Sequence, residues 1–109
     1  MNWTLEYLPE ALNDLNSLDN SIRGPVIKGI NKVLANPLPK IQGGYGTPLG
    51  NKDGNNLTNL FKIKFLKYGI RVVYMLEYQR GIIKVIIISA RADNQVYKET
   101  ARRRNTYDL

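Results

Sequence analysis

The sequence predicts an α+β fold, with an N-terminal helical hairpin packed on a mostly antiparallel sheet of four to five strands and a short basic C-terminal helix. Two observations support this prediction. Apolar residues at helical spacing follow a first strand-like segment, and three strand-like segments joined by tight turns come later. A length of 109 residues suits a single domain spanning 1–109.

The first strand is expected over 2–8, because apolar and polar residues alternate there. The apolar positions are Trp3, Leu5 and Tyr7. Pro9 suits the first turn of a helix, and apolar residues at helical spacing continue that helix. They are Ala11, Leu12, Leu15 and Leu18.

A second helix is expected from Asp19 or Asn20, since either side chain can cap a helix start. It carries one apolar stripe of Ile22, Val26, Ile27, Ile30, Val33 and Leu34. The helix should stop at Asn36, because the residue before Pro37 disfavours helical geometry. A short connection between two helices favours an antiparallel hairpin.

Segment 36–59 is rich in Gly, Pro and Asn and is expected to be a loop with room for one short strand. Three strands are then expected over 60–67, 70–78 and 82–89. Their tight connections make them antiparallel neighbours. From Asp93, the sequence predicts a helix with an N-cap at its start and arginines in its last turn.

The net charge of +7 lies entirely in the second part of the chain. Segment 1–61 has five basic and five acidic residues, whereas 62–109 has eleven basic and four acidic ones. This asymmetry favours a polyanionic partner, nucleic acid first and an acidic protein second. A basic surface that only aids solubility is the alternative.

The chain contains no cysteine and no histidine, which excludes disulfides and removes the commonest metal ligands. We therefore expect no metal site and no cofactor. The first residues do not resemble a signal peptide, and no apolar run approaches the length of a membrane span. The expected location is the cytoplasm, without membrane association.

The segment FKIKFLKYGIR contains two lysines on one strand face. Residues two apart in a strand share a face. Lys62 and Lys64 therefore lie on one face of this strand, and Phe61, Ile63 and Phe65 lie on the other face. If the helical hairpin covers the aromatic side, the lysines lie on the open side. An ordinary solvated strand face is the alternative.

These motifs, taken in order, resemble one known family. A strand with Trp, the helix PEAL, a helix ending in Asn-Pro, PLG, FKIKFLKYGIRVVY and SARADNQVYKETARRR follow one another as in the RelE/ParE superfamily of bacterial type II toxins. The resemblance spans nearly the whole chain. It implies a toxin domain, most similar to the RelE-type mRNA interferases.

RelE-type RNases use lysines, arginines and a tyrosine, and the matching positions here are Lys62, Lys64, Arg71, Arg91 and Tyr97. The resemblance thus implies a metal-independent endoribonuclease with Lys64, Arg71, Arg91 and Tyr97 as catalytic residues. Lys62 would hold backbone phosphate. Further RNA contacts are expected from the basic positions Lys67, Arg102, Arg103 and Arg104. For the three arginines, stabilisation of the helix C-terminus is an equal alternative.

RNA cleavage without metal requires attack of a 2′-OH on the adjacent phosphate. Arg71 suits the added phosphate charge, because a guanidinium pairs with two phosphate oxygens. Tyr97 or Lys64 is the expected base, and Arg91 is expected to stabilise the leaving 5′ oxygen or to act as the acid. Lysine and tyrosine titrate near pH 10 unless perturbed, so neighbouring cations would have to favour their deprotonated forms.

The resemblance also implies partners. They are a RelB-like antitoxin that wraps the toxin, mRNA, and the ribosomal A site with its rRNA. Two other functions fit the same sequence: a ParE-like poison of DNA gyrase on the same fold, and a non-catalytic basic module that binds nucleic acid.

Overall fold

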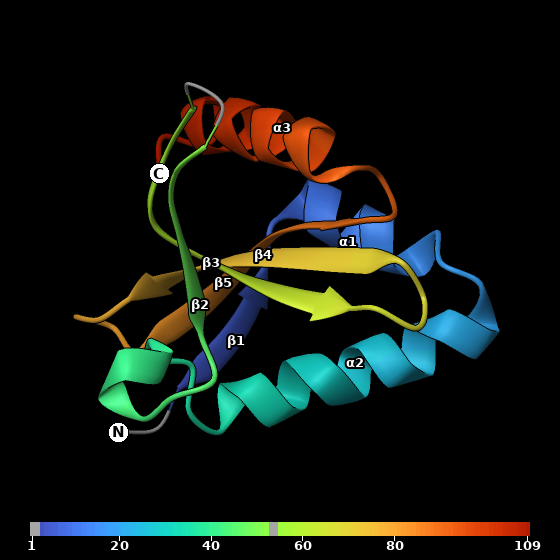
Figure 1. The fold of residues 1–109 in the computed structure, drawn as a ribbon, viewed down its shortest axis with the longest axis horizontal. Coiled ribbons are helices and arrows are strands. Elements are labelled where there is room, and N and C mark those ends of the chain that lie inside the picture. Colours follow the sequence, from blue (N-terminus) through green and yellow to red (C-terminus); the bar gives the residue numbers. More distant parts are fainter. Residues whose placement is uncertain (1–2, 53–54) are drawn as a thin grey trace.

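The computed structural model describes residues 3–52 and 55–109, which form one sheet and three α-helices (Figure 1). In chain order the elements are β1 (Thr4–Tyr7), α1 (Pro9–Asn16), α2 (Asn20–Leu34), the short 3₁₀ helix η1 (Lys40–Gln42), β2 (Thr47–Lys52), β3 (Asn55–Phe65), β4 (Ile70–Glu77), β5 (Ile82–Ser89) and α3 (Asp93–Thr106). The predicted α+β class is confirmed.

The sheet has five strands in the order β1-β5-β4-β3-β2. All neighbours are antiparallel except β1 and β5, which are parallel with Thr4 opposite Ile82. Strand β5 lies between two others and is buried along most of its length, as its continuous apolar sequence predicts. The expectation of a mostly antiparallel sheet is confirmed.

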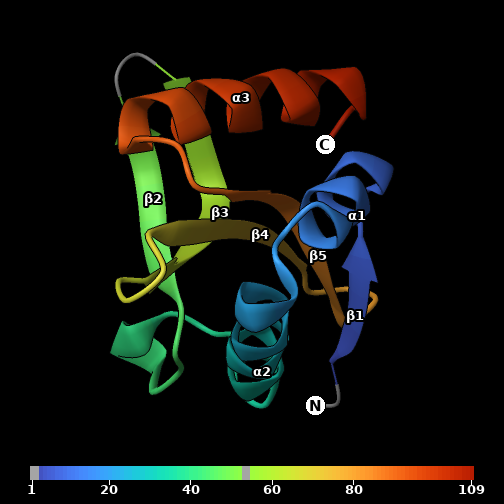
Figure 2. The ribbon, with the colours of Figure 1, turned by 90° about the vertical axis from the view of Figure 1, so that its right-hand side faces the viewer.

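Helices α2 and α3 lie on opposite sides of the sheet (Figures 1 and 2). On the α2 side, the Phe65 ring packs so closely on Gly29 that a side chain at that glycine would overlap it. Phe61 and Val33 belong to one buried cluster on this side. The lysine face of β3 is therefore turned toward the α3 side, as the alternation of apolar residues predicts.

The edge of β5 beyond Val85 is sealed by side chains instead of a strand. Backbone pairing with β1 ends there, and the Leu8 amide donates to the Val85 carbonyl at 3.0 Å. Beyond Val85, two backbone groups of β5 bond to charged side chains. The Ile88 amide donates to Asp14 at 3.1 Å, and Arg103 donates to the Ile86 carbonyl at 2.9 Å. These bonds tie α1, β5 and the end of α3 together.

The start of one strand differs from expectation. Strand β3 begins at Asn55 rather than near residue 60, because its first part pairs with β2, with Gly50 opposite Leu57. Residues 53–54 of the expected loop lie outside the described residues. The C-terminal helix has 14 residues, and its N-cap is Ala92, which makes no side-chain capping bond.

The second helix begins where expected, with Asp19 as its N-cap, although no side-chain capping bond forms. The Asp19 carboxylate instead accepts a hydrogen bond from the Ser21 hydroxyl at 2.9 Å. Within the described part of the chain, no helix is both long and apolar enough to cross a bilayer.

Candidate nucleic-acid interface

Basic side chains from neighbouring strands meet on the α3 side of the sheet. Lys64 on β3 lies directly opposite Arg71 on β4, and Arg71 lies opposite Ser89 on β5. Lys62 is two residues before Lys64 and therefore shares its face. We call Lys62, Lys64 and Arg71 the cation row.

An acidic residue at the start of α3 bridges two members of the cation row. Asp93 accepts a hydrogen bond from Lys64 at 3.2 Å and another from Arg71 Nε. Partial desolvation acts to raise the pKa of the Asp93 carboxyl, but the bonds from Lys64 and Arg71 outweigh it and hold the pKa below its usual range. The carboxylate is therefore ionised at neutral pH and lies between Lys64 and Arg71.

Arg71 is also fixed from a second direction, since its Nη1 donates to the Arg91 carbonyl at 2.8 Å. This bond links β4 to the segment between β5 and α3. The Arg91 amide in turn donates to the Ser89 hydroxyl at 3.1 Å. The backbone around Arg91 is thus held close to the cation row before any ligand binds.

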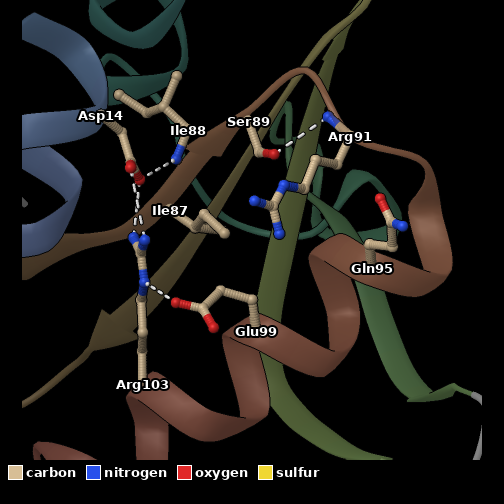
Figure 3. Close-up of a pocket in the computed structure, with 8 residues that line it drawn as sticks. All are labelled: Asp14, Ile87, Ile88, Ser89, Arg91, Gln95, Glu99 and Arg103. Atoms are coloured by element: carbon tan, nitrogen blue, oxygen red, sulfur yellow. Dashed lines mark hydrogen bonds and ion pairs between the residues drawn. The ribbon is translucent and has the colours of Figure 1, made fainter. Parts of the chain in front are cut away.

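The Arg91 side chain reaches into a polar pocket of about 270 Å³ between β5, α1 and α3 (Figure 3). Gln95 and Glu99 line the α3 wall of this pocket, and Asp14 and Arg103 close its far end. Among the described residues, the Arg91 guanidinium has no hydrogen-bonded or ion-paired partner in the structure. It is a cation available to a ligand.

Two further cavities border the cation row. One, of about 330 Å³, is lined by Lys62 and Lys64 together with Lys40 and Tyr45. These last two residues belong to the segment 35–46 between α2 and β2, which contains η1 and which we call the η1 loop. The other, of about 160 Å³, lies at the β3–β4 turn and is lined by Lys64 and Arg71. Lys67 is exposed in this turn, with its ammonium 5.6 Å from the centre of the Tyr68 ring. Basic side chains thus line both of these cavities.

Tyr97 lies one turn into α3 and is only 5% exposed, as part of the main hydrophobic core. Lys64, with a side chain 35% exposed, is the more accessible of the two expected bases. A half-buried position in the helix is the ordinary expectation for a lone tyrosine, and Tyr97 is buried more deeply than that.

The three arginines of α3 differ in their surroundings, and one corrects the sequence-based expectation. Arg103 is 7% exposed and pairs with Asp14 at 2.7 Å and Glu99 at 2.8 Å, so it is an internal structural residue and not part of an RNA-binding surface. Arg102 is exposed but pairs with Glu10 and Glu99. Arg104 donates to the Leu109 carbonyl at 3.2 Å.

The Arg102 and Arg103 contacts lower the pKa of an acidic side chain on α3, Glu99. The hydrogen bond from Arg102, followed by the one from Arg103, outweighs desolvation and lowers the pKa of Glu99 to about 2. Most of the positive charge at the end of α3 is therefore neutralised within the protein. No group of three or more acidic side chains among the described residues is arranged to bind a metal ion.

Asp93 is the residue of this interface that sequence reasoning missed. Its place at a helix start suggested a capping role, because aspartate commonly caps helices. The available signal was that Asp93 lies two residues after Arg91, in the segment that returns from β5 to the lysine face.

No protein-family model matches the chain, and no curated protein sequence matches it. Solved structures do match. A double arginine-to-alanine mutant of the E. coli toxin RelE in the free state aligns with a TM-score of 0.72 and 23% identity, covering 94% of this chain and 98% of that one. The toxin–antitoxin complex RelBE2 from Mycobacterium tuberculosis gives 0.64 and 18% identity, over 84% of this chain and 100% of the other.

An archaeal RelE–RelB complex from Pyrococcus horikoshii also matches, with a TM-score of 0.58 and 15% identity over 85% of this chain and 99% of that one. The three matches cover most of the chain and nearly all of each known structure. This chain therefore has the fold of RelE-type toxins.

Proposed function

Given the RelE-type fold, we propose that the chain is the toxin of a type II toxin–antitoxin system and that it cleaves mRNA without a metal ion. The observation that supports this most strongly is the placement of Lys64 directly opposite Arg71, with Arg71 bonded to the Arg91 backbone. Lys64 and Arg71 thus flank one position on the α3 side of the sheet, and the Arg91 side chain lies in the adjoining pocket between β5, α1 and α3. A phosphodiester is the RNA group that matches such a position.

In the proposed reaction the 2′-oxygen attacks the adjacent phosphorus as its proton leaves. The bond from phosphorus to the 5′ oxygen breaks, and that oxygen takes up a proton. The products are a 2′,3′-cyclic phosphate and a 5′-OH end. The chemistry requires a group to receive the first proton, cations to hold the added phosphate charge, and a group to stabilise the leaving oxygen.

We assign the phosphate charge to Arg71, since its guanidinium is held in place by two protein contacts. Lys64 in its deprotonated amine form receives the 2′ proton, with Tyr97 as the second candidate, and Arg91 stabilises the leaving oxygen. Lys62 holds the neighbouring backbone phosphate. A base of this kind is poorly matched to neutral pH, so alignment of mRNA in the ribosomal A site would supply much of the rate.

We further propose an antitoxin as the protein partner. The known structures with this fold include complexes of RelE with RelB. The apolar side chains of Ile41 and Leu66 are almost fully exposed, in the segments that flank the cation row. A partner with acidic and apolar side chains would cover both features and block RNA access.

Primer extension on translated mRNA after induction of the protein tests the proposal. New 5′ ends within codons are expected from the wild type, and Arg71→Ala should lower cleavage by roughly 10²- to 10³-fold. Lys28→Ala is the matched control, because Lys28 is an exposed cation on α2. Intact mRNA together with stalled DNA gyrase would contradict the RNase assignment and favour the gyrase poison.

A further inference from the structure

A cavity of about 330 Å³ lies beside the cation row, and two residues that line it, Lys40 and Tyr45, have no role in the proposed reaction. Lys40 and Tyr45 from the η1 loop form one wall, and Lys62 and Lys64 on β3 form the other. Its volume lies at the lower end of the range for small-ligand sites. Among the residues that the structure describes, no acidic side chain lines it.

The loop that carries Lys40 and Tyr45 is held in a fixed shape. The Lys40 amide donates to the Gly46 carbonyl and the Gly46 amide donates to the Leu38 carbonyl, both at 2.9 Å. The buried Tyr74 hydroxyl donates to the Pro37 carbonyl at 3.0 Å, and a Cβ at Gly46 would come within 2.7 Å of that hydroxyl. The wall of the cavity is therefore formed before a ligand arrives.

The side chains of this wall combine an aromatic surface with positive charge. Tyr45 is 48% exposed although the loop around it is ordered by backbone bonds. The Lys32 ammonium lies over its ring, 5.5 Å from the ring centre. An exposed aromatic ring between lysines is the arrangement that single-stranded nucleic acid binds, because bases stack on the ring and phosphates pair with the ammonium groups.

We propose that this cavity binds the nucleotide next to the scissile phosphate, with its base stacked on Tyr45 and its phosphate held by Lys40 and Lys62. This inference rests on the proposed RNase function, since Lys64 lines both the cavity and the reaction site. The cavity adds a base-binding element to a cation row that by itself contacts only phosphate. It would align the strand so that the next 2′-OH faces Lys64.

Binding of a short RNA with a 2′-O-methyl group at every position tests this inference, because such an RNA is bound but not cleaved. Fluorescence anisotropy should show that Tyr45→Ala weakens binding roughly tenfold or more, whereas Tyr45→Phe retains it. Lys40→Ala should lower the slope of log affinity against log salt by about 0.7. Tyr78→Ala is the matched control, since Tyr78 is also 48% exposed but directly follows the end of β4 that is farther from Arg71.

Two results distinguish failure of this inference from failure of the proposed function. If Tyr45→Ala and Tyr78→Ala bind RNA as the wild type does while the wild type cleaves mRNA, the cavity is not a nucleotide site but the RNase assignment stands. If the wild type neither binds the RNA nor cleaves mRNA, both proposals are overturned. Thermal unfolding of Tyr45→Ala at the wild-type temperature would show that its loss of binding is not a loss of fold.

Discussion

The substitution Asp93→Asn tests two opposite roles of the Asp93 carboxylate. The carboxylate either competes with an RNA phosphate for Lys64 and Arg71 or holds these two side chains in place for RNA binding. Asp93 pairs with both Lys64 and Arg71, which flank the position that we propose for the RNA phosphate. An RNA phosphate must therefore displace the carboxylate or bind beside it, against like-charge repulsion. Asparagine keeps the size of the side chain and removes its charge, so we expect tighter RNA binding by the variant.

The size of the effect follows from the exposure of the three groups. Two unit charges 4 Å apart interact by about 1 kcal/mol in water and about 4 kcal/mol at the effective dielectric constant of a protein surface. The side chains of Lys64, Arg71 and Asp93 are 27–39% exposed, so solvent screening favours the lower values. A repulsion of about 1–2 kcal/mol corresponds to roughly 5- to 30-fold tighter binding.

Anisotropy titrations of the 2′-O-methyl RNA at several salt concentrations measure this effect. Asp108→Asn is the control, because it makes the same change in net charge at an exposed residue near the C-terminus. We expect Asp108→Asn to change the affinity by less than about twofold at physiological salt. Binding by Asp93→Asn equal to that of Asp108→Asn would refute competition, and weaker binding would show in addition that the carboxylate positions the two cations. Loss of these partly exposed pairs should lower the free energy of unfolding by at most about 1 kcal/mol.

Three further predictions concern stability. Tyr74→Phe should lower the free energy of unfolding in urea by about 1–2 kcal/mol, because the buried Pro37 carbonyl loses its donor; an unchanged midpoint would contradict this. Arg103→Met should cost about 3 kcal/mol and Arg102→Met clearly less, since only Arg103 is buried. Equal losses of stability in the two variants would refute the distinction. The free energy of unfolding of the wild type should fall as the pH drops from about 5 toward 2, because the pKa of Glu99 is lowered to about 2 in the folded protein. Urea titrations at each pH measure this fall, and Glu99→Gln should show a smaller one.

The orientation of β3 could be predicted from the sequence because it depends on local alternation. Phe61 and Phe65 are apolar and Lys62 and Lys64 charged, so only one orientation puts the aromatic side chains against a helix. The turn at Gly69, which has a positive φ of 64°, likewise follows from the sequence. The cation row was therefore predictable once the strands were.

The surroundings of the arginines in α3 could not be predicted in the same way. Arg102, Arg103 and Arg104 are adjacent and chemically identical, and only helix rotation decides which one turns inward. The partner that stabilises the buried one, Asp14, is 89 residues away in sequence. The bridging role of Asp93 depends equally on tertiary structure, because its partners lie on strands β3 and β4.

The parallel pairing of β1 with β5 has a consequence for the order of folding. It joins Thr4 to Ile82, so the first strand has no sheet partner until the last strand has been made. Helix α1 depends on the same late strand, because Asp14 accepts from the Ile88 amide. Contacts so distant in sequence slow folding, since the chain must close a long loop before they form. A nascent chain that ends before β5 would therefore leave β1 and α1 undocked and would also lack Arg91, so we expect truncated chains to lack the proposed RNase activity.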